Sequence, residues 1–208
     1  MLKELFLRYP SLKECEGSII SAEKAIIECY EKGGKLLLCG NGGSCADCDH
    51  ITGELMKGFL KKRPLSDEKI EEMKKLSPTL DEETLKKLQC GLPALSLVSM
   101  NALVSAFCND VDPELIYAEN VLGLGKAGDV FIGISTSGNA KNVSAAAKVA
   151  KGLGMTVIGL TGQGGGALGE IADITIRVPE RETFKVQELH LPVYHYLCAA
   201  VEAYFFDV

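Results

Sequence analysis

The chain has 208 residues and a formal net charge of −6 at pH 7. This length can bury a substantial hydrophobic core, and the acidic balance argues against nucleic-acid binding, which depends on clustered Lys and Arg. The sequence has no run of 18 apolar residues and no signal-peptide pattern, so we expect a cytoplasmic protein with neither a nucleic-acid nor a membrane partner.

The first predicted element is an amphipathic helix over 11–34, within an N-terminal helical segment formed by residues 1–34. Its apolar residues recur at helical spacing, and a Gly-Gly pair follows as a stop signal. The apolar positions are Leu12, Cys15, Ile19, Ile20, Ile26, Ile27 and Tyr30. Such a helix is expected to cover a sheet face or another subunit.

Five short runs rich in Leu or β-branched residues predict buried parallel strands. The runs span 35–39, 94–98, 129–135, 155–160 and 173–178. Helical patterns stand between them, most clearly over 139–154, where Ala and Val repeat before a Gly stop. Strands alternating with helices predict an α/β fold, and we assign residues 1–208 to a single domain.

Residues 61–91 form a highly charged segment between the first two predicted strands. Pro64 and Pro78 act as breakers, and helix starts of the S/T-x-x-E kind are read in SDEKIEE and TLDEETLKKL. The segment is therefore predicted to be a helical insertion.

Two predicted strands end in similar turns, LLLCGNGGS and FIGISTSGN. Ligands of open α/β sheets bind at the carboxyl ends of strands, where helix N-termini offer free N–H groups. The turn at 135–139 adds three hydroxyls, and Ser44 is expected to add another while capping the next helix. Neither turn fits a dinucleotide or Walker pattern, so a small phosphorylated metabolite is the predicted ligand. The alternative is that both turns only start helices.

His50 and Glu54 are four residues apart, so a helix beginning near Ser44 places them on one face. This spacing suits a metal site, an acid/base pair or a solvated pair. The other histidines lie in a C-terminal helical pattern that contains Pro192. Spacing there leaves Gln187 and Glu188 both open as partners of His195, since Pro192 can bend the helix.

Cys45, Cys48 and His50 form a C-x-x-C-x-H pattern. Structural zinc normally needs four ligands, and no second C-x-x-C exists. A redox pair would stand at a helix start in a suitable fold, whereas these cysteines follow a GNGGS turn. Both functions are therefore disfavoured. We expect most of the eight cysteines to behave as small hydrophobic residues in a reducing compartment.

Four stretches, CGNGGS…DHITGEL, GISTSGNAKNV, VIGLTGQGGG and VQELHLPVYH, resemble in order and spacing the sugar isomerase (SIS) domain family, and within it most resemble the sedoheptulose 7-phosphate isomerases, or phosphoheptose isomerases. The resemblance implies a three-layer αβα sandwich with a five-stranded parallel sheet, flavodoxin-like in type, and a homotetramer with active sites at subunit interfaces. It also implies zinc-assisted conversion of D-sedoheptulose 7-phosphate to D-glycero-D-manno-heptose 7-phosphate through an enediol, the first step of nucleotide-activated heptose biosynthesis.

The same resemblance implies roles for individual residues. Zn²⁺ would be held by His50, Glu54, Gln187 and His195, with Glu54 as the catalytic base and His195 as the acid. The substrate would be bound by Asn41, Gly42, Gly43, Ser44, Asp110, Ser135, Thr136, Ser137, Asn139 and Gln187.

The sequence departs from the family pattern in three places. Ala140 stands where serine is common, an acid expected near Thr183 or Phe184 is missing, and the 61–91 insertion is longer than expected. The first two changes bear on substrate preference, and the third bears on assembly or on covering the site.

Two alternatives remain open beside this isomerase. One is an isomerase or lyase that acts on another sugar phosphate. The other is a non-catalytic SIS regulator that binds a protein partner, which the presence of Glu54 and His195 disfavours. A DNA-binding regulator lacks support, because no helix-turn-helix segment or basic patch stands in the sequence.

Overall fold

A computed structural model describes residues 1–206 of the chain. Its five strands form one parallel sheet in the order β2-β1-β3-β4-β5. They are β1 (Leu36–Gly40), β2 (Ala94–Ser96), β3 (Val130–Ser135), β4 (Thr156–Thr161) and β5 (Ile174–Arg177). All five predicted strands are present, which confirms the α/β prediction.

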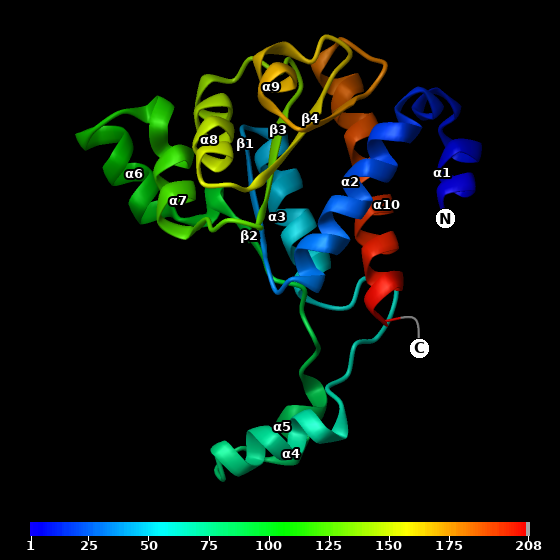
Figure 1. The fold of residues 1–208 in the computed structure, drawn as a ribbon, viewed down its shortest axis with the longest axis vertical. Coiled ribbons are helices and arrows are strands. Elements are labelled where there is room, and N and C mark those ends of the chain that lie inside the picture. Colours follow the sequence, from blue (N-terminus) through cyan, green and yellow to red (C-terminus); the bar gives the residue numbers. More distant parts are fainter. Residues whose placement is uncertain (207–208) are drawn as a thin grey trace.

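Helices cover both faces of this sheet, because successive strand residues point to opposite sides. Leu36 and Leu38 contribute to one hydrophobic core, whereas Leu37 and Cys39 contribute to the other. The first core is covered by α2 (Glu16–Glu31), α3 (Gly43–Met56) and α10 (Thr183–Phe206), and the second by α7 (Ile116–Leu124), α8 (Lys141–Gly152) and α9 (Gly166–Ile171) (Figure 1). The predicted three-layer sandwich is confirmed.

The N-terminal segment is helical but not one continuous α-helix. It contains α1 (Leu2–Arg8), the 3₁₀ helix η1 (Pro10–Cys15) and then α2. The predicted helix over 11–34 therefore starts too early, since Pro10 opens a tighter helical turn that runs to Cys15. The Cys15 thiol donates a hydrogen bond to the Arg177 carbonyl (3.0 Å), which ties this turn to the end of β5.

Residues 61–91, called the arm below, form a helical insertion as predicted, and they project away from the sheet (Figure 1). The arm contains α4 (Asp67–Leu76) and α5 (Glu82–Lys87). Ser66 caps α4, but the cap of α5 is Asp81, which accepts a hydrogen bond from the Thr84 N–H (2.8 Å). The S/T-x-x-E reading in TLDEETLKKL is thus corrected, because the Asp81 carboxylate is placed to satisfy the first free N–H groups of the helix. An antiparallel bridge between Pro64 and Gln89 closes the base of the arm.

A helical region joins β2 to β3. It contains η2 (Leu97–Ser99), α6 (Asn101–Asp110), η3 (Pro113–Leu115) and α7. Helix α6 lies at the rim of the molecule, and none of its residues is buried in this chain (Figure 1). Within residues 1–206, no helix is both long enough and apolar enough to cross a membrane.

Candidate active site

The two predicted ligand-binding turns lie side by side at the carboxyl edge of the sheet. The first follows β1 and the second follows β3, and these strands pair directly, with Gly40 opposite Ile134. The strand order reverses around β1, because β2 lies on one side of it and β3 on the other. Open α/β sheets bind their ligands at such a reversal.

The first turn contains Asn41, Gly42 and Gly43. Gly42 has φ +56° and is the N-cap residue of α3, without a side-chain cap. The prediction that Ser44 caps this helix is therefore wrong. Ser44 lies inside the first helical turn and is buried against Gly40, where an added Cβ would meet the Ser44 Cβ at 2.8 Å.

Asn41 is held by side chains of α7 and α8, which cover the face of the sheet opposite to α3. Its carboxamide forms two hydrogen bonds with that of Asn142 in α8 (2.9 and 3.0 Å), and the Tyr117 hydroxyl donates to its Oδ1 (3.2 Å). The sequence analysis missed Asn142 and Tyr117. Asn142 could have been found from its place just after the STSGN turn, whereas no sequence signal marks Tyr117.

The second turn is closed by its own polar groups. The Gly138 N–H donates to the Ser135 carbonyl (3.0 Å), and the Asn139 N–H donates to Ser137 Oγ (3.2 Å). The Gly162 N–H donates to the Thr136 carbonyl (2.9 Å), which joins the turn to the loop after β4. Ser137 and Asn139 are exposed, whereas Ser135 is buried. The turn thus exposes a hydroxyl and a carboxamide side chain directly before the start of α8, an arrangement that suits a phosphate group.

His50 and Glu54 lie on one face of α3, as their spacing predicts. His50 Nε2 is 3.2 Å from Glu54 Oε1, and the Glu54 side chain is 16% exposed. The His195 ring of α10 stacks edge-on against the His50 ring, with centroids 5.0 Å apart. Burial and the adjacent His50 lower the pKa of His195. A carboxylate and a neutral imidazole therefore stand together, as acid–base chemistry requires.

Gln187 lies elsewhere on α10. The helix runs unbroken through Pro192, so eight residues separate Gln187 from His195 by about 12 Å along the axis. The Gln187 carboxamide packs on the first turn, where a Cβ on Gly43 would lie 2.4 Å from its Nε2, and Glu188 is exposed. The structure thus brings His50, Glu54 and His195 together and places Gln187 beside the glycine turn.

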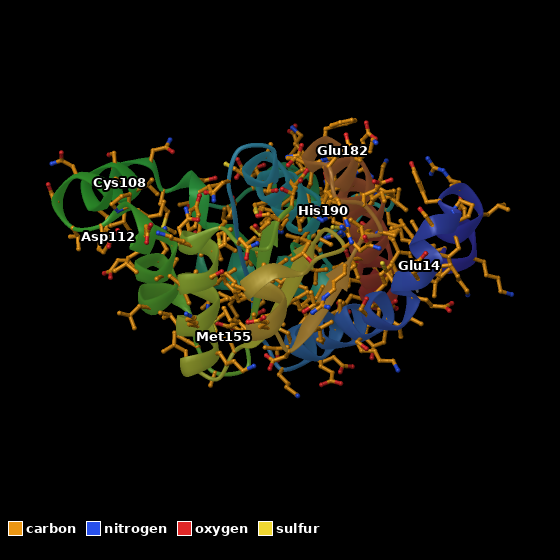
Figure 2. All side chains as sticks on the ribbon, turned by 90° about the horizontal axis from the view of Figure 1, so that it is seen from above. Glu14, Cys108, Asp112, Met155, Glu182 and His190 are labelled. Atoms are coloured by element: carbon orange, nitrogen blue, oxygen red, sulfur yellow. The ribbon has the colours of Figure 1, made fainter. Side chains whose placement is uncertain are left out.

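Asp110 is also separate from this group within one chain. It ends α6, which packs chiefly on α7 and η3, and its carboxylate accepts a hydrogen bond from the Asn109 side chain (2.8 Å). Figure 2 shows Cys108 and Asp112, which flank this position, at one rim of the molecule, with His190 of α10 well inside.

The C-x-x-C pattern forms no disulfide. Cys48 is fully buried in the core beside β1, and burial raises the pKa of its thiol well above the usual value. Cys45 is only partly buried, and its pKa is also raised. High pKa values disfavour the thiolate that redox chemistry and metal binding require.

The fit of a metal ion can be judged from the same side chains. Among residues 1–206, no three His, Cys, Asp or Glu side chains are already grouped as a metal site; instead, His50 contacts Glu54 directly. However, His195 Nε2 is buried without a hydrogen-bond partner among the described residues. Two imidazoles, a carboxylate and a carboxamide are donor types that Zn²⁺ accepts, so the residues fit zinc by their chemistry.

Comparisons with known proteins agree with the fold and with the substrate class. A family model described as "SIS domain" matches residues 97–201, and another of the same description matches residues 10–85. The chain is 36% identical to a phosphoheptose isomerase from Roseiflexus sp. (strain RS-1) over 189 residues, which are 91% of this chain and 83% of the relative.

Two solved structures share the whole architecture. A phosphoheptose isomerase from Neisseria gonorrhoeae superposes with a TM-score of 0.74 at 29% identity, covering 98% of this chain and all of that one. A phosphoheptose isomerase from Francisella tularensis gives a TM-score of 0.73 at 30% identity, covering 96% and 97% of the two chains.

Proposed function

The chain belongs to the phosphoheptose isomerase family of SIS-domain proteins, isomerases that act on a sugar phosphate, and from this premise we propose that it interconverts D-sedoheptulose 7-phosphate and D-glycero-D-manno-heptose 7-phosphate. The reaction would be the first step of nucleotide-activated heptose biosynthesis. The observation that carries the proposal is the grouping of His50, Glu54 and His195.

Glu54 is the proposed base. Its carboxylate removes a proton from C1 of the ketose, the C1–H electron pair forms the C1–C2 double bond of an enediol, and the C2 oxygen takes up a proton. The O1 proton is then lost while the carboxylic acid returns its proton to C2, which gives the aldose without net gain or loss of atoms. The partial burial of Glu54 keeps water from competing for the proton.

His195 is the proposed acid that serves the substrate oxygens. Its lowered pKa keeps the ring largely neutral near neutral pH. A neutral imidazole has one protonated nitrogen, so His195 can give that proton to the C2 oxygen and recover one from O1 at the same nitrogen, which leaves its other nitrogen for the proposed metal.

The two turns are the proposed phosphate and hydroxyl sites. Ser135, Thr136, Ser137 and Asn139 would bind the phosphate together with Ser44, and Asn41 would bind a sugar hydroxyl. The exposed Ser137 and Asn139 side chains, which precede the first turn of α8, support this assignment. Ala140 is the N-cap residue of α8 and offers no hydroxyl, so one phosphate contact that is common in the family is missing.

Zn²⁺ is the proposed metal, held by His50, Glu54, Gln187 and His195. It would act as a Lewis acid that polarises the substrate carbonyl. The unpartnered Nε2 of His195 supports this assignment. The Gln187 side chain, which lies against Gly43 in this chain, would have to turn toward the group to become a ligand.

A homotetramer is the proposed assembly, with each site completed by a neighbouring copy. Helix α6 is rich in apolar residues yet none is buried, and Leu103 is 41% exposed. The same helix ends in Asp110, and the neighbouring Cys108 and Asp112 lie at one rim of the molecule (Figure 2). A substrate-binding Asp110 would therefore serve the site of another copy.

The deciding experiment is an NMR time course of the purified protein with sedoheptulose 7-phosphate. We expect an aldoheptose 7-phosphate to appear with the wild type, and the rate to fall by about 10²- to 10⁴-fold in Glu54→Gln, which loses the base. Glu28→Gln, at an exposed glutamate of α2, is the matched control and should keep the wild-type rate. No conversion by folded wild type would reject the heptose substrate and direct the assay to other sugar phosphates.

A further inference from the structure

A hydrogen-bonded chain of side chains stands behind His50. The Tyr194 hydroxyl is 3.1 Å from His50 Nδ1 and donates a hydrogen bond to Asp47 Oδ1, also at 3.1 Å. Asp47 lies one turn before His50 on α3, and Tyr194 comes from α10. The contacts therefore join the two helices that carry the proposed chemistry.

The Tyr194 hydroxyl has a single hydrogen, and this limits how the chain can be protonated. An ionised carboxylate only accepts hydrogen bonds, so the hydrogen of Tyr194 points at Asp47. The remaining contact to His50 then needs a donor on the imidazole side, because two lone pairs do not bond to each other. Nδ1 of His50 must carry the proton.

A neutral imidazole protonated at Nδ1 has its lone pair on Nε2. In this structure Nε2 faces Glu54 Oε1 at 3.2 Å, and both atoms are then acceptors. Two acceptors that face each other are stabilised when a cation, such as a metal ion, lies between them. Metal-bound histidines in general owe their tautomer to an acceptor on the far ring nitrogen.

We propose that Asp47 and Tyr194 are positioning residues that hold His50 as the Nδ1-protonated tautomer and direct its Nε2 lone pair toward Glu54. The inference deepens the proposed function, on which it rests for the ion that uses this lone pair, Zn²⁺. Neither residue touches the substrate in this role; they act through His50.

Packing fixes the orientation of the ring as well. Tyr194 and His195 both meet the His50 ring edge-on, with centroids 5.5 and 5.0 Å away. Asp47 Oδ2 is buried and has no hydrogen-bond partner among the described residues, so the Tyr194 hydroxyl is the one described side-chain donor to this carboxylate. The carboxylate thus has one function in the chain of contacts, which is to orient that hydroxyl.

The test compares Tyr194→Phe with Tyr196→Phe. The first variant keeps the aromatic ring and removes only the hydroxyl. The second removes a tyrosine hydroxyl from the same helix that makes a different contact. The Tyr196 hydroxyl donates a hydrogen bond to Glu23 (2.6 Å). Both proteins are compared with the wild type by long-range ¹H–¹⁵N NMR of the histidine rings in metal-free protein at mildly alkaline pH, with His50→Gln used to assign the signals.

We expect His50 to be protonated at Nδ1 in the wild type and in Tyr196→Phe. In Tyr194→Phe the proton should move to Nε2, where it can bond Glu54. Zinc affinity, measured by competition with a chromogenic chelator, should fall by about 10- to 100-fold in Tyr194→Phe and stay unchanged in Tyr196→Phe.

Two results would overturn the inference: a wild-type His50 protonated at Nε2, or a Tyr194→Phe protein with unaltered tautomer. The ring spectra need neither metal nor substrate, so they decide the positioning role even if the isomerase assay fails. A wild type with the expected tautomer that binds no zinc would reject the metal in the proposed function and leave the positioning of His50 supported.

Discussion

At the residue scale, the candidate site depends on histidines in three different surroundings. His50 is 42% exposed, and its two ring nitrogens face the Tyr194 hydroxyl and the Glu54 carboxylate. His195 is partly buried and its Nε2 has no hydrogen-bond partner among the described residues, whereas His190 is fully buried. We therefore expect His50 to bind the proposed metal, His195 to transfer protons and His190 to fill space in the core.

The first prediction concerns His195. Replacement by Gln keeps a polar side chain of similar length but removes the exchangeable proton of the imidazole, so we expect kcat to fall by about 10²- to 10⁴-fold. Circular dichroism should show unchanged helix content. A variant that retains most of its kcat would contradict the assignment of His195 as the acid.

The second prediction concerns the pH dependence of stability. Burial lowers the pKa of His190 to about 4, against a smaller opposing contribution from the Thr161 backbone. The unfolded chain, with an ordinary value near 6.5, binds a proton first as the pH falls, so stability present above pH 6.5 is lost toward pH 4. The difference corresponds to about 3 kcal/mol.

Urea unfolding at a series of pH values checks this expectation. The free energy of unfolding of His190→Leu should fall less steeply than that of the wild type between about pH 6.5 and 4, whatever the stability of the variant at neutral pH. Parallel curves for the two proteins would show that His190 does not control this loss.

At the element scale, the arm is joined to α10 by a buried ion pair. Arg63 and Glu202 are almost fully buried and 2.8 Å apart. The Arg63 guanidinium also donates to the carbonyls of Leu55 (2.7 Å) and Glu54 (3.2 Å), near the end of α3. Burial raises the pKa of Glu202, but the N–H groups of Phe59 and Leu60 together with Arg63 hold the pKa below its usual value.

The third prediction follows from that pair. Arg63→Met leaves the Glu202 charge buried without its partner, so the free energy of unfolding should fall by about 3–5 kcal/mol. Adding Glu202→Leu removes the uncompensated charge and should restore part of the loss. A double variant less stable than Arg63→Met would contradict this account.

The fourth prediction concerns the rest of the arm. Because Pro64 and Gln89 pair as antiparallel neighbours, a short glycine-containing turn can replace residues 66–87. The buried side chains of the two arm helices, Ile70 and Leu85, are removed together, and the buried Arg63 stays in place. We expect the shortened protein to fold with its far-ultraviolet spectrum reduced only by the lost helices; failure to fold would show that the arm stabilises the body.

At the scale of the whole molecule, the site residues are divided between the interior and the rim. His50, Glu54 and His195 meet between α3 and α10, whereas Asp110 ends the exposed helix α6. In the proposed tetramer, Asp110 would complete the site of a neighbouring copy, and that copy would cover the exposed apolar helix.

The fifth prediction tests this division by mixing inactive variants. Glu54→Gln and Asp110→Asn are each expected to lose activity. If Asp110 serves a neighbouring copy, subunits exchanged between the two variants should regain activity, because some sites then combine an intact Glu54 with an intact Asp110. The control mixture of Glu54→Gln with His195→Gln should stay inactive, since both residues come from the same chain. If both mixtures regain activity, or if neither does, the proposal that two copies share a site is rejected.

The sequence by itself determined the features that depend on local spacing. The five strands, both glycine turns and the shared face of His50 and Glu54 were all predicted correctly, because periodicity and turn chemistry are properties of neighbouring residues. The same local rules erred at the helix start near Ser44 and at the start of α5, where different residues serve as caps.

Only the tertiary structure decided which distant side chains meet. Tyr194 reaches His50 and Asp47 across more than 140 residues, Arg63 reaches Glu202 across 139, and Asn41 reaches Asn142 across 101. The packing of α10 on α3 also placed Gln187 against Gly43 rather than beside His195. Such contacts depend on how two helices are rotated against each other and against the sheet, and no periodicity within one segment carries that information.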